Sequence, residues 1–329
     1  MNNINNSENK AKKKTSTAKS ERIKLDEILK LLFNVSKSTL INAINGLFNE
    51  KYNPVDVDIS ISKTATEYVK NNLDIIRADL FIQVIADGIT RDYHLEFQIS
   101  ADNSMIFRML EYDIQHALDN LRLDDTEELV LKLSKSLVIH FTPSDRIPSK
   151  YKIKVLFSNG TIGEYEADVM KYWNYSDTAL LEKKLYNLLP LQLFILRIEF
   201  EKARKEKDRK LRKLAISRGK ASIEKITSII TELHDNEEIN SDDYNKIISG
   251  LNEIENYLDK KYKLNNQLTG GKKMIKTIAD KNILNRATKA ESKIIEIVKK
   301  LLLKNTPINE IIEITELTEE KIKDIQKTM

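Results

Sequence analysis

Two acidic residues, Asp79 and Glu96, occur in neighbouring segments of β-strand character, and Gln98 follows Glu96 by two positions. Two carboxylates at cross-strand distance repel each other, so the pKa of one of them rises unless a cation compensates the charge. Mg²⁺ suits this role, because it binds one or two carboxylates, keeps several waters and accepts substrate phosphates. A bound Mg²⁺ would polarise a phosphodiester and help to deliver hydroxide to it. The same residue types also fit a polar cross-strand pair on a solvated sheet face, without any catalytic role.

A β-hairpin has to bring these side chains together, and the sequence between them predicts one. Two runs of β-branched and aromatic residues flank Asp87-Gly88, a dipeptide that accepts the positive φ angles of a tight turn. We expect a loop of residues 86–89, which sets a register in which Asp79 lies directly across from Glu96. Because side chains alternate along a strand, Gln98 shares the face of Glu96, and the apolar residues of this strand face a hydrophobic core.

These residues also resemble a known family. Sixteen residues separate Asp79 from Glu96 in the string His94-Leu95-Glu96-Phe97-Gln98, a pattern that resembles the Rpn family. This family is the recombination-promoting nuclease or putative transposase branch of the PD-(D/E)XK nucleases. The likeness covers roughly residues 26–200 and includes Thr66-Glu67-Tyr68, Arg77-Ala78-Asp79, Met105-x-x-Arg108-x-x-x-Tyr112 and Leu185-x-x-Leu188-Leu189-Pro190-Leu191.

The resemblance implies an α/β fold with a restriction-endonuclease-like core, a mixed sheet flanked by helices, followed by an all-α C-terminal region. It also implies a DNA endonuclease in which Asp79 and Glu96 bind Mg²⁺, or Mn²⁺ in its place. Gln98 stands where many relatives carry lysine; it can orient a water but supplies no charge. Glu67 either leans toward the metal or pairs with Arg77. A second class of function therefore stays open, a nuclease-derived DNA-binding or regulatory module that does not cleave.

Residues 102–118 predict an amphipathic helix in which Arg108, Tyr112 and His116 recur at helical spacing and so share one flank. Arg108 could clamp a DNA phosphate through two N–H groups, or it could pair with Glu111 or with a carboxylate of a neighbouring helix. Tyr112 is another candidate DNA contact, although its type and position also fit the edge of a core with a hydrated hydroxyl. We expect a structural role for His116.

Composition limits the class of protein. The 329 residues are 41% hydrophobic and 32% charged, which predicts a true core together with long solvated helices. There is no cysteine, so disulfides and thiolate zinc sites are excluded, and a reducing cytoplasm is the expected compartment. No apolar run approaches the roughly 18–20 residues of a membrane span, so we expect no membrane association. The sequence also lacks a phosphate-binding P-loop, a Gly-x-Ser-x-Gly elbow and a His-Glu-x-x-His motif.

Positive charge is concentrated in two blocks. We expect residues 1–24 to form a disordered basic tail, and residues 203–221 carry nine Lys or Arg against two acidic residues. Such blocks bind polyanions through counterion release, without reading sequence, although each also fits a solvated surface. The candidate DNA contacts in the second block are Arg204, Lys205, Lys207, Arg209 and Lys210.

The remaining patterns divide the chain into a nuclease-like domain, residues 25–200, and a helical accessory region, residues 201–329. In the first domain we expect strands over residues 55–61 and 135–141, a hairpin of residues 151–157 with 163–169, and a helix pair over residues 180–200 broken at Pro190.

In the accessory region, helical periodicity appears over residues 203–233, 241–262, 271–282 and 288–304, and these helices could form a homodimer. The residue pattern over 307–322 is typical of a helix-turn-helix, with Thr318 as N-cap of the second helix. Glu319 and Glu320 would meet phosphate at the start of that helix, so we expect a packing module instead of a sequence reader.

Overall fold

A computed structural model describes residues 25, 27–61, 68–70, 74–76, 80–99, 101–123, 129–268, 294–304, 306–315 and 317–327. Two of the predicted site residues, Asp79 and Glu67, lie outside the described residues, as do the predicted N-terminal tail and the helix predicted over residues 271–282.

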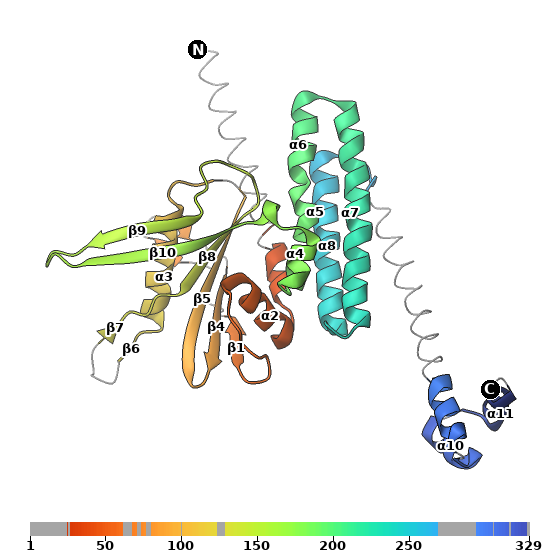
Figure 1. The fold of residues 1–329 in the computed structure, drawn as a ribbon. Coiled ribbons are helices and arrows are strands. Elements are labelled where there is room, and N and C mark those ends of the chain that lie inside the picture. The colour runs from red at the N-terminus through yellow and green to blue at the C-terminus, as the bar shows by residue number, and fades with distance from the viewer. Residues whose placement is uncertain are drawn as a thin grey trace.

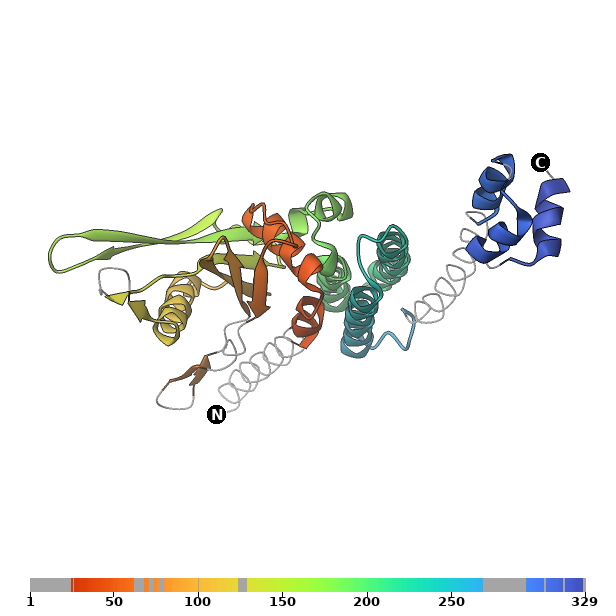
Figure 2. The ribbon, with the colours of Figure 1, turned by 90° about the horizontal axis from the view of Figure 1, so that it is seen from below.

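A mixed sheet of six strands forms the centre of the fold (Figure 1). Its spatial order is β1 (Asp58–Ile61), β4 (Leu80–Ala86), β5 (Ile89–Gln98), β8 (Lys135–His140), β10 (Ile162–Lys171) and β9 (Lys150–Leu156). Strand β8 is parallel to both of its neighbours, and the other neighbouring strands are antiparallel. The β9–β10 hairpin extends beyond the other strands (Figure 2). Two short pairs lie apart from this sheet: β2 (Tyr68–Lys70) with β3 (Asp74–Ile76), and β6 (Arg122–Leu123) with β7 (Leu129–Val130).

The β4–β5 hairpin has the predicted register but a shorter loop. The pairing runs from Leu80 opposite Leu95 to Ala86 opposite Ile89, so the predicted four-residue loop is wrong. Only Asp87 and Gly88 connect the strands, with φ angles of 53° and 72°. Positive φ at both central residues is the signature of a type I′ turn, whose twist matches that of the strands and lets pairing continue up to the turn.

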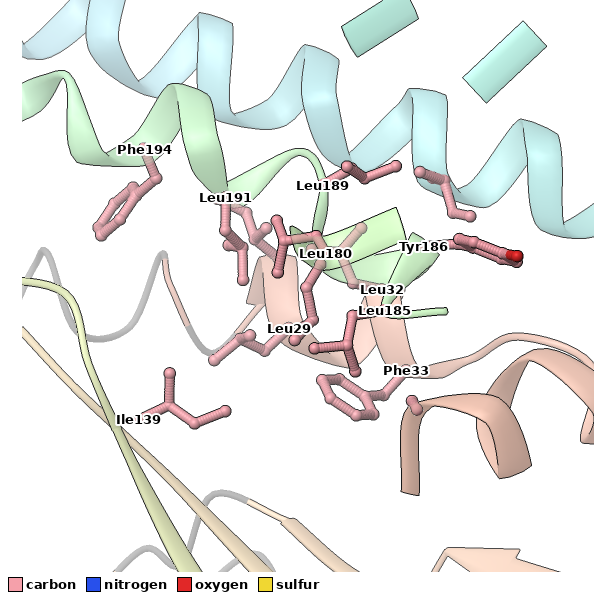
Figure 3. Packing of buried hydrophobic residues seen from close by; sticks show 14 of the residues in the cluster. Leu29, Leu32, Phe33, Ile139, Leu180, Leu185, Tyr186, Leu189, Leu191 and Phe194 are labelled. Carbon is pink, nitrogen blue, oxygen red and sulfur yellow. The ribbon is translucent and has the colours of Figure 1, made fainter. Parts of the chain in front are cut away.

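The two faces of the sheet are covered by different helices. On one face, the side chains of Tyr93, Leu95 and Phe97 join a large core with α2 (Lys37–Phe48), a helix over residues 27–33, η2 (Tyr186–Leu188) and α5 (Leu191–Ile195). Figure 3 shows this packing around Leu29, Leu185 and Ile139. The opposite face meets α3 (Met105–Asp119) through a smaller apolar cluster that includes Met109 and Val138. The mixed α/β fold predicted from the sequence is therefore confirmed.

The large core continues into the helical region. Apolar side chains of α7 (Arg209–Asp235) and α8 (Ser241–Tyr262) belong to the same buried cluster as the sheet. The helix predicted over residues 203–233 is interrupted, because α6 (Arg197–Glu206) ends at Lys207, which has a φ of 54°, and the Asp208 carboxylate caps the start of α7. The predicted helix pair over residues 180–200 is likewise divided into α4 (Asp177–Glu182), η2, α5 and the start of α6.

Two further boundaries differ from the predicted ones. Strand β1 begins at Asp58 instead of Val55, because Asn53 starts a turn in which its backbone carbonyl accepts from Asp56 N. Helix α3 begins at Met105 instead of Asp102, whose carboxylate accepts hydrogen bonds from the backbone and hydroxyl of Ser104.

The last described helices, α10 (Ile308–Thr315) and α11 (Glu319–Lys327), pack with residues 294–303 around Val298, Ile311 and Ile322. Across the described part of the chain, none of the helices combines the length and the apolar character that a bilayer crossing needs. Between the sheet and α4, a single 3₁₀ turn, η1 (Tyr172–Asn174), holds Trp173, the sole tryptophan.

Candidate functional site

Glu96 and Gln98 lie side by side near the end of β5, on the face covered by α3. The Glu96 side chain is fully buried, and Gln98 is 7% exposed. The Gln98 amide donates a hydrogen bond of 2.5 Å from Nε2 to Glu96 Oε1. The sequence prediction that these two side chains share a face is confirmed by this contact. A carboxylate and a carboxamide thus come together inside the protein, where electrostatic interactions are stronger than in water.

Arg108 of α3 lies directly beside this pair. Its Nη2 atom is 2.5 Å from Glu96 Oε1, and its Nη1 atom is 2.9 Å from Asp102 Oδ2. Its Nε donates to the Tyr112 hydroxyl at 3.4 Å. Its carboxylate partners are therefore a residue of the sheet and a residue just before the helix, and not Glu111 or a carboxylate of a neighbouring helix as predicted.

The pKa values of Arg108 and Asp102 are both shifted in favour of the charged forms. Burial lowers the pKa of Arg108, but the Glu96 charge and Tyr112 raise it by more, so the net pKa is raised and the guanidinium stays charged. Burial raises the pKa of Asp102, but hydrogen bonds from Ser104 and the Arg108 charge outweigh this and lower it. Tyr112 itself is 4% exposed, which agrees with the edge-of-core role and leaves little of its surface for a direct DNA contact.

A buried carboxylate that was not predicted from the sequence connects α3 to the sheet. Asp113 is fully buried and accepts hydrogen bonds from His94 Nδ1 at 2.8 Å, from Ser136 Oγ at 2.5 Å and from the Tyr165 hydroxyl at 2.5 Å. These donors belong to β5, β8 and β10. Burial, and then the Asp113 charge, raise the pKa of Tyr165, so its hydroxyl remains a donor. One helix residue therefore contacts three adjacent strands.

Two histidines, His94 of this network and the neighbouring His116, have packing roles. The His94 ring stacks on Phe81 with ring centroids 4.2 Å apart, and the His116 ring stacks on Phe81 at 4.1 Å. His116 Nε2 lies 3.5 Å from Asp92 Oδ1. The structural role predicted for His116 is confirmed by these contacts.

A third buried histidine, His140, lies on the strand next to Gln98. His140 is the last residue of β8 and lies opposite Gln98 in the parallel pairing. Its Nε2 is 3.1 Å from the Tyr151 hydroxyl. Burial, helped by the positive charge of Lys171 on β10, lowers the pKa of His140 to about 4, so the imidazole is neutral near pH 7. The strand that contains His140 was predicted from the sequence, but no role was predicted for this residue.

The five predicted basic contacts gather at the turn between α6 and α7, which Figure 1 shows at one end of the helical bundle. All five side chains are exposed: Arg204, Lys205, Lys207, Arg209 and Lys210. Arg204 pairs with Glu201 at 2.7 Å, an exposed contact that leaves it available to other anions.

The start of α6 is attached to the strand ends that carry the candidate site. The buried Arg197 guanidinium, at the first residue of α6, donates to the Ile99 carbonyl at 3.3 Å and to the Thr142 hydroxyl. Ile99 directly follows β5, and Thr142 lies two residues after β8. Helix α6 is thereby connected by hydrogen bonds to the residue that follows Gln98 and to the segment that follows β8.

The described residues supply part of a Mg²⁺ ligand set. Within the described ranges, no group of three or more His, Asp or Glu side chains gathers as a metal site. Glu96 and Gln98 offer a carboxylate and an amide oxygen, which are donor types that Mg²⁺ accepts alongside waters and substrate phosphates. The prediction that Asp79 faces Glu96, and the one that Glu67 contributes, stay predictions. Comparison with known proteins gives no assignment: no family model, no curated protein and no solved structure matches the chain.

Proposed function

We propose that the chain is a metal-dependent DNA endonuclease of the Rpn type, with a restriction-endonuclease-like core and a role in recombination or mobile elements. The observation that carries this proposal is the buried Glu96 carboxylate, with Gln98 and Arg108 in direct contact at one end of β5. Burying a carboxylate beside an arginine costs desolvation free energy, and such pairs are frequent at functional sites. Buried ion pairs also occur for structural reasons.

In this proposal each side chain has a separate task. Glu96, with Asp79, would hold Mg²⁺, and Mn²⁺ could take its place. When bound, the ion would polarise the phosphodiester and make water a better nucleophile. Gln98 would orient that water by a hydrogen bond, and Arg108 would compensate the charge that develops on the phosphate.

DNA would be held mainly by its phosphates. The exposed cations of the α6–α7 turn are suited to contacts with the backbone, which carry no sequence information. Each lost phosphate contact should reduce the slope of log affinity against log salt by about 0.9. We therefore expect Lys210→Gln to weaken binding equally for all duplex sequences. A cytoplasmic location agrees with this proposal and with the lack of cysteine.

Plasmid nicking in the presence of Mg²⁺ tests the proposal. We expect Glu96→Ala to reduce the nicking rate by about 100-fold or more, the scale of losing a group that stabilises charge in the transition state. Glu224→Ala is the matched control, because Glu224 is an exposed residue of α7 and its loss should leave the rate unchanged. If Glu96→Ala nicks DNA as fast as the control, the site assignment is wrong.

The second candidate function is a DNA-binding module that does not cleave. Two observations favour it: Gln98 brings no positive charge to the site, and Arg108 already pairs with Glu96. Salt-sensitive DNA binding, without nicking under Mg²⁺ or Mn²⁺, would support this candidate over the endonuclease.

A further inference from the structure

Arg108 makes two ion pairs of unequal character. One joins it to Glu96, which is fully buried, and the other joins it to Asp102, whose side chain is 34% exposed. The Arg108 side chain itself is 21% exposed, so its guanidinium lies between the interior and the surface. Asp102 and Tyr112 flank Arg108 along the chain and would keep it near the site even without the contact to Glu96.

A divalent cation at Glu96 would meet this guanidinium. The contact uses Glu96 Oε1, the same oxygen that accepts from Gln98. Two cations at one buried carboxylate repel each other strongly, because the surroundings screen charge less than water does. Metal binding at Glu96 is therefore opposed for as long as the guanidinium stays in this position.

Phosphate offers Arg108 an alternative partner. Arg108 contacts Glu96 through Nη2 and Asp102 through Nη1, so the two nitrogens are divided between two carboxylates. A phosphate can accept two parallel N–H bonds from one guanidinium, which is the arrangement that arginine favours with this group. An anion arriving at the exposed side would thus attract the guanidinium away from Glu96.

We propose that Arg108 couples the two ligands of this site: a nucleic-acid phosphate draws its guanidinium from Glu96, and a divalent cation takes the vacated position. This inference rests on the proposed function, since it assumes that Glu96 is a metal ligand. Coupling between two ligands is reciprocal, so DNA raises the affinity for the cation by the same factor by which the cation raises the affinity for DNA. The protein would then hold its metal tightly only when DNA is present.

Binding of Mn²⁺ tests the coupling without any need for cleavage. Free Mn²⁺ is measured by electron paramagnetic resonance in titrations with and without a short DNA duplex. Binding by Glu96→Gln under the same conditions is subtracted, which removes ions held by DNA or elsewhere on the protein. The remaining signal reports the Glu96 site alone.

We expect DNA to raise the Mn²⁺ affinity of the wild-type site on the order of tenfold. Arg108→Gln should raise the Mn²⁺ affinity without DNA by a similar factor and abolish the effect of DNA. Arg108→Lys keeps the charge, so its Mn²⁺ affinity without DNA should lie between that of the wild type and that of Arg108→Gln. Lys225→Gln is the control for net charge, because Lys225 is exposed and pairs with Asp177 on the surface. Thermal melts establish that each variant is folded.

The outcomes separate the two proposals. If wild type and Glu96→Gln bind Mn²⁺ alike with and without DNA, Glu96 is not a metal ligand, and the proposed function and the coupling both fail. If a Glu96-dependent site exists but its affinity is the same with and without DNA, the coupling alone is refuted. The coupling is also refuted if Arg108→Gln matches Lys225→Gln.

Discussion

Removal of the Asp113 carboxylate tests how α3 is held against the sheet. In Asp113→Ala, three buried donors on three strands lose their acceptor: His94 Nδ1, the Ser136 hydroxyl and the Tyr165 hydroxyl. A buried donor left without a partner costs about 1–3 kcal/mol. Two effects reduce the total: the Ser136 and Tyr165 hydroxyls can rotate toward new acceptors, and the variant no longer has to desolvate a carboxylate. We therefore expect a loss of about 3–5 kcal/mol in the free energy of unfolding, the range for breaking a buried charged network.

Urea denaturation measures this loss, with circular dichroism and the fluorescence of Trp173, the single tryptophan, as two probes. Asp119→Ala is the control on the same helix, because Asp119 is exposed and accepts a hydrogen bond only from Gln115 among the contacts described. Its effect should stay within about 0.5 kcal/mol. In a double-mutant cycle, Asp113→Ala should cost less in a Tyr165→Phe background, with a coupling of about 0.5–3 kcal/mol.

Two results would refute this reasoning. One is an Asp113→Ala effect no larger than that of Asp119→Ala, which would mean that the apolar contacts of α3 suffice to hold it. The other is a full effect of Asp113→Ala with no coupling to Tyr165→Phe, which would mean that the hydroxyl of β10 takes no part in the network.

Three further predictions concern stability in urea. The pKa of His140 is about 4 in the folded protein against 6.5 in the unfolded chain. Its contribution to the free energy of unfolding is therefore fully present above pH 6.5 and is lost as the pH falls toward 4. This contribution, about 3 kcal/mol, should be absent in His140→Gln. Asp243→Ala should cost about 2–4 kcal/mol, since it removes three hydrogen bonds to the start of α2, whereas the exposed Asp242→Ala should be nearly neutral. Gly46→Ala should destabilise by about 1–3 kcal/mol despite alanine's helix propensity, because its Cβ would lie 2.2 Å from the Lys183 carbonyl oxygen.

Local rules were enough to predict the centre of the sheet. Asp87-Gly88 specified the turn, and the alternation along β5 separated Glu96 and Gln98 from the apolar face. The β4–β5 register was predicted correctly although the predicted loop was too long. The shorter turn only adds one residue pair, Ala86 with Ile89, and leaves the other pairs unchanged. Predictions of this kind succeed when near neighbours in the chain determine the geometry.

Contacts between distant segments were harder to predict. Asp113 did carry a signal, since it lies on the same helix face as Met109 and His116, where a carboxylate would otherwise be buried without a partner. Its donors come from strands that are far apart in the sequence, and nothing local identifies them. The role of His140 depends in the same way on which strands lie beside β8, and the parallel pairing with β5 is not encoded in either strand alone.

Arg108 shows how such a distant contact determines the chemistry of the site. Its distance from Glu96 depends on the rotation and height of α3 above β5, because the two residues lie on different elements. Asp113, five residues later on α3, contributes to both by hydrogen bonds to β5, β8 and β10, together with the apolar contacts of α3 around Met109. The network that we expect to stabilise the fold therefore also helps to place the Arg108 guanidinium beside the Glu96 carboxylate. It follows from the proposed metal site that Asp113→Asn, even in a folded protein, should change the Mn²⁺ affinity that depends on Glu96, which a network with a purely structural role would leave unaltered.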